Sequence, residues 1–207
     1  MAMTILLSDA GKRYNREWIF RHFTYQFKTD SSFAIIGPNG SGKSTLLQVL
    51  SGSMMLNEGN IQYSINNVQC PIENIYQHVS ICAPYLELVE EMTLKEFLVF
   101  HHGFKPFLKD ITVEKIISII GLEHAANKQI RYYSSGMKQR VKLAQCIFSD
   151  TPIVLLDEPC TNLDETGFHL YNQLINDHCK KRMVIVSSND HHEYAFCKEK
   201  IYIPDWK

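Results

Sequence analysis

Short runs that alternate apolar and polar residues occupy the first part of the chain. These runs lie at residues 4–7, 18–20 and 23–27, and polar residues separate them. A period of two is typical of strands that bury one face, and polar breaks between short runs favour hairpin connections. Residues 3–36 are therefore predicted to begin with a small antiparallel sheet.

The pattern changes at residues 32–36, which form a largely apolar run. A glycine-containing loop follows, and residues 44–51 then have helical character before Gly52. Glycine often ends a helix because it adopts positive φ angles without steric cost. The order of elements in this stretch is therefore predicted to be strand, loop and helix.

The middle of the chain, from about residue 86 to residue 148, favours helices. Apolar residues with a helical period precede Gly121, and they are Val113, Ile116, Ile117 and Ile120. Beyond this region, residues 153–156 and 183–186 are unbroken apolar runs, as expected for strands covered on both faces of a parallel sheet. The chain is therefore predicted to be an α/β protein.

Composition narrows the class of protein. The chain has 207 residues, of which 45% are hydrophobic and 21% charged, and these values are typical of a soluble globular domain. The 21 basic and 22 acidic side chains give a formal net charge of -1. This balance provides no basic field for nucleic acid, so no nucleic-acid partner is expected.

The spacing of the cysteines and the length of the apolar runs argue against metal-binding, redox and membrane-spanning classes of protein. The six cysteines form no C-x-x-C pair, so neither a zinc cage nor a redox dithiol is predicted. His101 and His102 likewise have no carboxylate or cysteine at metal-ligand spacing, and packed or exposed imidazoles are expected. Because no run approaches about 18 apolar residues, neither a membrane span nor a signal-peptide core is expected.

A glycine-rich loop carries the first candidate chemistry. It reads Gly37, Pro38, Asn39, Gly40, Ser41, Gly42, Lys43 and Ser44. The loop fits the pattern G-x-x-x-x-G-K-[ST] between a predicted strand and a predicted helix, as a phosphate-binding P-loop requires. A simple connecting turn would explain Gly40 and Gly42, but it would not explain the Lys43-Ser44 pair.

The residue types in this loop suit a nucleoside triphosphate. Glycines allow successive N–H groups to turn inward, and the following helix adds its positive end. Lys43 supplies a charge for the β- and γ-phosphates, and Ser44 a hydroxyl for Mg²⁺. The predicted nucleotide site extends to Thr45.

An acidic pair follows the apolar run at residues 153–156. Asp157 is predicted at the carboxyl end of a buried strand, where ligand sites form in open α/β sheets, and is the candidate Mg²⁺ ligand. Glu158 is the candidate general base or water-polarising group. The alternative is an acidic turn after a core strand, which has no role in chemistry.

A third motif identifies a family. Residues 133–140 read Tyr133, Ser134, Ser135, Gly136, Met137, Lys138, Gln139 and Arg140. This segment resembles the L-S-G-G-Q-x-Q-R signature of ATP-binding cassette (ABC) ATPases, although three of its positions are replaced. Pro159 with residues 161–164 resembles the D-loop of that family. Tyr14 lies 29 residues before Lys43 and resembles the aromatic residue that stacks on adenine.

The resemblance covers nearly the whole chain and implies one ABC ATPase domain over residues 1–207. It implies a P-loop NTPase (RecA-like) core, an N-terminal antiparallel β-subdomain and an inserted helical subdomain at about residues 86–148. It also implies that Ser134 and Gly136 act on the γ-phosphate of a second cassette, so that ATP joins the two. The Ser134-Ser135 pair can also cap a helix from about residue 135 to residue 148.

These properties lead to an expected function with ATP and Mg²⁺ as its cofactors. The chain is expected to be the ATPase subunit of an ABC transporter, which forms a homodimer and docks on a separate transmembrane permease subunit. Its expected location is cytoplasmic, peripheral on the inner face of the cell membrane. The short stretch after Asn189 resembles compact single-cassette subunits of exporters, such as the haem exporter of cytochrome c assembly.

Two positions depart from the family pattern. No glutamine lies between Gln77 and Gln129, so Tyr85, Glu87 or a water molecule must replace the glutamine of the family. Asn189 falls at the position of a histidine that contacts the γ-phosphate, unless a shifted turn brings His191 there. An amide donates a hydrogen bond but does not change charge near pH 7, so slow hydrolysis is expected.

Two other functions are consistent with parts of the sequence. The first is a soluble ABC-type switch that dimerises with ATP, hydrolyses it weakly and has no transport role. The second is a P-loop small-molecule kinase, which would use Lys43 but gives no purpose to residues 134–140 or 161–164.

Overall fold

The structure is a computed structural model that describes residues 2–207. The chain forms two compact units. The first unit comprises the chain up to Ile81 with Thr151–Glu158 and Lys181–Lys207, and the second comprises Cys82–Asp150 and Pro159–Lys180. The second unit thus contains residues 159–180 in addition to the predicted helical region, and the organisation of residues 1–207 as one domain stays a prediction.

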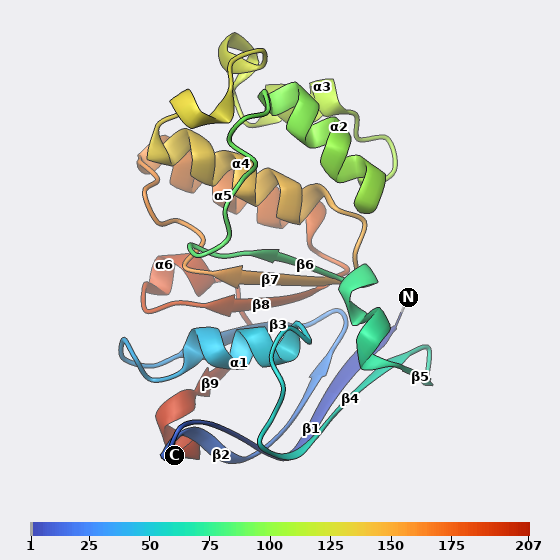
Figure 1. Cartoon of the computed structure of the whole chain (residues 1–207), viewed down its shortest axis with the longest axis vertical. Helices are drawn as coiled ribbons and strands as arrows, with labels where there is room; N and C mark the ends of the chain where they lie inside the picture. Colours follow the sequence, from blue (N-terminus) through green and yellow to red (C-terminus); the bar gives the residue numbers. More distant parts are fainter. Residues whose placement is uncertain (1) are drawn as a thin grey trace. The chain divides into compact units, whose positions relative to one another are not determined.

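An antiparallel sheet occupies the first unit (Figure 1). Its strands are β1 (Met3–Tyr14), β2 (Glu17–Lys28), β4 (Glu58–Ile65) and β5 (Val68–Cys70), in the order β2-β1-β4-β5. The predicted N-terminal hairpin is confirmed, whereas β4 and β5 have no counterpart in the predicted elements. Two predicted short runs are joined in β2, because a register shift and a positive φ of 55° at His22 form a bulge there.

A second sheet forms the α/β part of the first unit. Its strands are β6 (Val79–Cys82), β7 (Ile153–Asp157), β8 (Met183–Ser187), β3 (Ser32–Ile36) and β9 (Glu199–Tyr202), in the order β6-β7-β8-β3-β9. Strand β8 pairs in parallel with β7 and with β3, and β3 pairs in parallel with β9. All residues of β7 and β8 are buried, which confirms the expected strands covered on both faces.

Helix α1 (Lys43–Leu50) follows β3 through the glycine-rich loop, and the short helix α6 (His191–Tyr194) follows β8. Aromatic side chains contribute to the core of this unit. The ring centroids of Phe27 and Phe33 are 4.9 Å apart, and those of Phe23 and Trp206 are 4.8 Å apart. These contacts join the antiparallel sheet to β3 and to the C-terminal 3₁₀ turn Ile203–Trp206.

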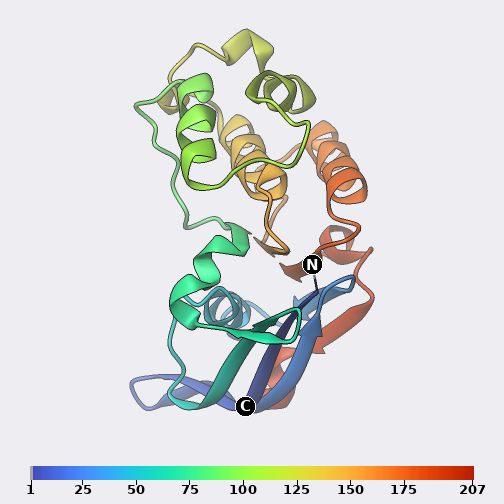
Figure 2. The ribbon, with the colours of Figure 1, turned by 90° about the vertical axis from the view of Figure 1, so that its right-hand side faces the viewer.

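Helices dominate the second unit, as predicted. They are α2 (Leu94–Phe104), α3 (Val113–Ile119), α4 (Ser135–Phe148) and α5 (Glu165–His178). Helix α4 has the predicted bounds and packs beside α5 (Figure 2). The capping residue of α3 is Thr112, and after this helix Gly121 has a φ of +68°, which confirms the glycine stop.

No helix within residues 2–207 is both long enough and apolar enough to cross a membrane. The six cysteines are free thiols. The observed pair of sheets and the helical unit confirm the predicted α/β class.

Candidate functional site

The first part of the candidate site is the N-terminus of α1. Gly42 is the N-cap residue, and no side chain caps the helix there. The backbone N–H groups of Lys43, Ser44 and Thr45, in the first turn, therefore have no partner within the helix. Unpaired N–H groups and the positive end of the helix dipole together favour an anion at this position.

Two glycines let the loop adopt this shape. Ser41 N donates a hydrogen bond of 3.0 Å to Pro38 O, which closes a turn in which Gly40 has a φ of +77°. At Gly42 the φ is +105°, and a Cβ atom would lie 2.1 Å from Ile19 Cγ2. Only glycine fits at Gly42, because a side chain would have to occupy the same space as Ile19.

The Lys43 side chain is buried beneath this loop. Its Nζ donates hydrogen bonds to Gly37 O at 2.9 Å and to Pro38 O at 3.4 Å. Burial lowers the pKa of Lys43, while the charges of Glu158 and Asp157 act to raise it. The ammonium group is thus held by the loop carbonyls and has two carboxylates in its surroundings.

A cavity of about 330 Å³ lies at this loop. It is lined by Tyr14, Ile19, Asn39, Gly40, Gly42, Lys43, Ser44, Thr45 and Glu158. The structure therefore brings most of the predicted nucleotide residues to one place, whereas Gly37, Pro38 and Ser41 lie in the loop but not on the lining. Ile19 was not predicted, because an apolar residue in a strand carries no signal of a ligand.

Tyr14 is half exposed, with 47% of its surface accessible. Its hydroxyl donates a hydrogen bond of 3.3 Å to Met54 Sδ, and Lys12 Nζ lies 5.7 Å from the centre of its ring. The aromatic ring thus lines the cavity from the end of β1.

The acidic pair lies at the carboxyl end of β7. Asp157 is 2% exposed, and its Oδ1 accepts a hydrogen bond of 2.6 Å from Ser187 Oγ. Glu158 N donates to Ser187 O at 2.8 Å, and Glu158 has a φ of +44°. Such a backbone conformation is strained in a non-glycine residue and is concentrated at functional sites. The turn places the exposed Glu158 on the cavity.

Asn189 lies beside the same loop. Its Nδ2 donates a hydrogen bond of 2.6 Å to Asn39 Oδ1. His191, the alternative for this position, is the first residue of α6 and packs against Tyr194, with 5.3 Å between the ring centres.

The signature motif begins α4 in the second unit. Ser134 is the N-cap residue, and its side chain accepts a hydrogen bond of 3.2 Å from Met137 N. A Cβ atom at Gly136 would lie 3.0 Å from Asn162 O, so the helix and the following loop are close together there. Gln139 Nε2 donates a hydrogen bond of 2.6 Å to Pro159 O.

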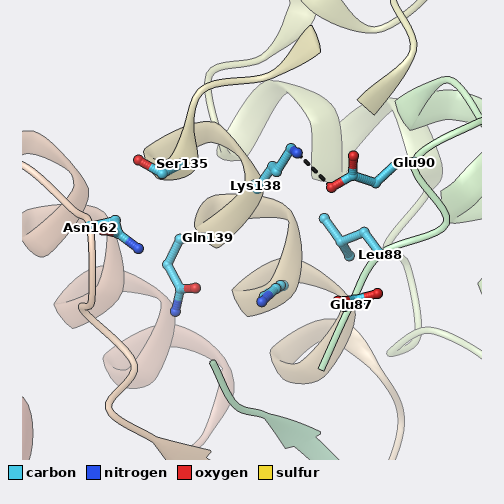
Figure 3. Close-up of a pocket in the computed structure, with 8 residues that line it drawn as sticks. Glu87, Leu88, Glu90, Ser135, Lys138, Gln139 and Asn162 are labelled. Atoms are coloured by element: carbon cyan, nitrogen blue, oxygen red, sulfur yellow. Dashed lines mark hydrogen bonds and ion pairs between the residues drawn. The ribbon is translucent and has the colours of Figure 1, made fainter. Parts of the chain in front are cut away.

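A second cavity, of about 390 Å³, lies beside α4 (Figure 3). It is lined by Glu87, Leu88, Glu90, Ser135, Lys138, Gln139, Lys142 and Asn162. Lys138 forms an ion pair with Glu90, with 2.5 Å between Nζ and Oε1. Glu87 therefore shares a cavity with the signature helix, whereas Tyr85 is 46% exposed.

Within residues 2–207, no group of three or more His, Cys, Asp or Glu side chains is arranged to hold a metal ion. His101 Nε2 lies 2.9 Å from Ser149 Oγ, and its ring packs at 5.8 Å from that of Phe107.

The first-unit site has one more property that bears on a phosphate ligand. Ser41 Oγ is buried and has no hydrogen-bond partner among residues 2–207. A buried hydroxyl without a partner is costly, and a ligand oxygen can satisfy it. Together with the free N–H groups and Lys43, this hydroxyl shows that the residues present fit a polyphosphate.

Comparisons with known proteins identify the family and similar folds. A family model described as ABC transporter matches residues 20–161. The Bacillus subtilis protein named uncharacterized ABC transporter ATP-binding protein YhcH is 29% identical over 201 residues, which are 91% of this chain and 63% of that protein. The chain thus spans less than two thirds of the length of this relative.

A second relative is the cytochrome c biogenesis ATP-binding export protein CcmA of Reclinomonas americana. It is 29% identical over 173 residues, which are 82% of this chain and 77% of that protein. A solved dimeric ATP-binding cassette, in a post-hydrolysis state with ADP and phosphate, has the same fold. Its TM-score is 0.77 at 22% identity, covering 96% of this chain and 93% of that one.

Proposed function

The chain belongs to the ABC transporter family, and we propose that it is an ATP-hydrolysing subunit that powers transport through a separate transmembrane subunit by ATP-dependent dimerisation. The observation that carries this proposal is the cavity at α1. Lys43 and Ser44, the proposed phosphate- and Mg²⁺-binding residues, line this cavity together with Glu158, which supports the proposal.

ATP binding uses unpaired N–H and hydroxyl groups together with the charge of Lys43, whose Nζ is held by the carbonyls of Gly37 and Pro38. The first-turn N–H groups of α1 and the Lys43 ammonium bind the phosphates, and Ser41 Oγ is available as a further donor. Tyr14, at the edge of the same cavity, stacks on the base. Binding therefore gives the first-turn N–H groups and Ser41 Oγ hydrogen bonds to phosphate oxygens.

Mg²⁺ would be held by the Ser44 hydroxyl and by Asp157, directly or through water. When bound, it supplies positive charge to the β- and γ-phosphate oxygens. Ser187 holds one oxygen of Asp157 by a hydrogen bond of 2.6 Å and so fixes the direction of this carboxylate.

Hydrolysis depends on Glu158 and Asn189. Glu158 orients the attacking water and accepts its proton, and the Asn189 amide donates a hydrogen bond to the γ-phosphate. An amide offers less electrostatic stabilisation than an imidazolium. Complete loss of such a contact lowers turnover by about 10² to 10³-fold. Because the amide supplies only part of this stabilisation, slow hydrolysis is expected.

The γ-phosphate requires a second cassette to cover it. Ser134 and the N–H groups near Gly136 lie at the positive end of α4, a helix of 14 residues, and bind the γ-phosphate held by the other molecule. The fold shared with a solved dimeric cassette supports this arrangement. ATP then stabilises the dimer and hydrolysis releases it, with a homodimer as the simplest assembly.

The separate transmembrane subunit is proposed from the same family membership. The relative from Reclinomonas americana is named an export protein, which favours a chain that works on the inner face of the cell membrane with a permease. The transported compound would contact the permease rather than this subunit.

Turnover of Mg-ATP by the purified chain tests the enzymatic part of the proposal. We expect phosphate release that Glu158→Gln reduces at least about 10²-fold, while Glu165→Gln, which changes an exposed carboxylate on α5, leaves it unchanged. Equal rates for the wild type and Glu158→Gln would contradict the proposal.

A soluble switch remains the second candidate, because Asn189 and the residues near Glu87 replace two groups that couple hydrolysis to transport in the family. Purification from solubilised membranes separates the two functions. A multi-span protein that accompanies the tagged chain favours transport. Its absence favours the switch.

A further inference from the structure

Two side-chain amides face each other at the edge of the nucleotide cavity. Asn189 Nδ2 donates a hydrogen bond of 2.6 Å to Oδ1 of Asn39, which lines the cavity. The two residues are 150 positions apart in the sequence, so only the fold brings them together. Both are exposed, and water competes for the same hydrogen bond. The pair therefore adds little to folding, and its value lies in the orientation that it gives to Asn189.

The backbone on each side holds these amides in place. Asn39 lies in the turn that the hydrogen bond of 3.0 Å from Ser41 N to Pro38 O closes. Gly40 is the third residue of this turn and adopts the positive φ that this position requires, so the turn is rigid. The Asn39 side chain thus starts from a defined point of the phosphate loop.

Asn189 is held in a similar way. The preceding Ser188 is buried, and its N donates to Ile35 O at 3.3 Å, which ties the turn to the end of β3. The following Asp190 donates from its N to Ser188 Oγ at 2.9 Å and caps α6. With both backbones fixed, the remaining freedom is the rotation of the two exposed amides about their own side chains.

That rotation decides which end of the amide faces an anion. An amide has two N–H donors at one end and an acceptor oxygen at the other. Asn39 Oδ1 accepts one N–H of Asn189 and leaves the second N–H of the same nitrogen for a phosphate oxygen. If the Asn189 amide alone turned by half a rotation, its oxygen would face Asn39 Oδ1 and the two oxygens would repel each other. If both amides turned, Asn39 would become the donor, and Asn189 would present its oxygen rather than an N–H to the bound phosphates, which is unfavourable.

We infer that Asn39 is a positioning residue, which selects the donor orientation of the Asn189 amide at the γ-phosphate. The inference rests on the proposed function. It goes beyond that function because the side chain of Asn39, and not only the backbone of the phosphate loop, would contribute to the transition state. An imidazolium could donate from either ring nitrogen, whereas an amide needs a neighbour that determines its orientation. The pairing thus makes asparagine usable at this position.

A double-mutant cycle on the ATPase tests this role. We expect Asn39→Ala to lower kcat about five- to tenfold with little change in KM, and Asn189→Ala to lower kcat about 10²-fold. The double variant should be no slower than Asn189→Ala, because Asn39 has nothing left to orient. Effects that multiply in the double variant would overturn the inference, since Asn39 would then act independently.

A conservative variant gives a second, independent readout. Asn39→Asp keeps the acceptor oxygen and adds a negative charge beside the phosphates. We expect its kcat to stay within about twofold of the wild type while its KM rises, which reverses the pattern of Asn39→Ala. An equal loss of kcat in both variants would overturn the inference. Asn39→Ser takes the place of Asn39→Ala if the latter fails to fold.

Two controls separate this result from other effects. Asn60→Ala removes an exposed amide from β4, away from the cavity, and should change neither kcat nor KM. Calorimetric titration of ATP into Glu158→Gln, with and without Asn39→Ala, should give affinities within about twofold of each other. A large loss of ground-state affinity would identify Asn39 as a binding residue and overturn the positioning role.

The two proposals fail in different ways. If the wild type has no turnover that depends on Glu158, the proposed function is wrong. If turnover depends on Glu158 but Asn189→Ala leaves kcat unchanged, the ATPase stands and the positioning role of Asn39 is wrong.

Discussion

Ser187 Oγ donates a hydrogen bond of 2.6 Å to Asp157 Oδ1, and the two residues are direct partners on the parallel strands β8 and β7. Asp157 is 2% exposed, so its carboxylate depends on protein donors rather than on water. The register of two strands therefore determines the direction of a candidate Mg²⁺ ligand. A one-residue shift would turn either side chain to the other face of the sheet.

Replacement of Ser187 by alanine should destabilise the protein and weaken its use of Mg²⁺. A hydrogen bond to a buried charged group is worth about 1.5–3 kcal/mol, and we expect a loss of about that size in urea unfolding at pH 7. We also expect about a tenfold rise in the Mg²⁺ concentration for half-maximal ATPase, because outer partners orient metal ligands. Ser8→Ala, at an exposed position of β1, is the matched control and should change neither value. Unchanged Mg²⁺ dependence in Ser187→Ala would argue against Asp157 as a ligand.

Alanine at Gly42 should be far more harmful than alanine at Gly40. Both glycines have positive φ angles, which alone costs about 1–2 kcal/mol for another residue. At Gly42 the new Cβ would also lie 2.1 Å from Ile19 Cγ2, whereas at Gly40 it would meet no atom within 4 Å. We expect the steric conflict to add about 1–3 kcal/mol in urea unfolding.

The variant Ile19→Ala/Gly42→Ala distinguishes these two effects. Truncation of Ile19 removes the atom in conflict but not the backbone strain, so the double variant should recover part of the loss of Gly42→Ala. No recovery would mean that the positive φ of Gly42 accounts for the entire effect.

Two variants at Ser134 should distinguish its role in capping α4 from its proposed role in dimerisation. Ser134→Ala removes the cap of α4 and should cost about 1 kcal/mol of stability. Ser134→Asp keeps a capping oxygen but places a negative charge where, in the proposed dimer, the γ-phosphate of the second molecule would bind. We expect it to unfold like the wild type and yet to stay monomeric with ATP in the Glu158→Gln background, as measured by light scattering. An ATP-dependent dimer of Ser134→Asp would contradict the role in trans.

His101 should make the protein less stable in acid. Burial, and to a smaller extent the charge of Lys105, lowers the pKa of His101 from 6.5 to about 4. Between these two values the unfolded chain binds a proton that the folded chain does not. Stability should therefore fall as the pH falls from about 6.5 to about 4, by less than about 1.4 kcal/mol per pH unit, because partial exposure screens the effect.

Urea unfolding across this pH range measures the contribution of His101. His101→Gln should flatten the dependence between pH 6.5 and pH 4, relative to the wild type. His169→Gln replaces an imidazole that is 76% exposed on α5 and should leave the dependence as it is. The same slope in His101→Gln and in the wild type would show that other groups cause the loss.

Much of the fold could be predicted from local pattern. The strands at residues 32–36 and 153–156, and the helix from Ser135 to Phe148, were predicted close to their observed bounds. These elements have strong signals, namely continuous apolar runs or a capping serine before a helical period. Strands β4 and β5 were missed, because the exposed positions in them break the alternation.

The candidate site likewise contains residues that the sequence could identify and one that it could not. Lys43, Asp157 and Glu158 were identified as candidates from motifs, since the chemistry of phosphate and metal binding needs particular residue types at particular spacings. Ile19 was missed, although it lines the same cavity and leaves no room for a side chain at Gly42. Its contribution is steric, and an apolar residue in a strand looks the same whether it packs on a core or on a ligand loop.

The amino-acid order alone determined which chemistry is available: a glycine loop with Lys43, a carboxylate pair after a buried strand, and a serine that begins α4. These features are local, because backbone conformation and hydrogen bonding over a few residues produce them. Only the tertiary structure decided that Ser187 holds Asp157 and that Asn189 meets Asn39, 150 residues away. Such contacts depend on strand order and register, which arise from packing across the whole sheet and leave no trace in any short segment.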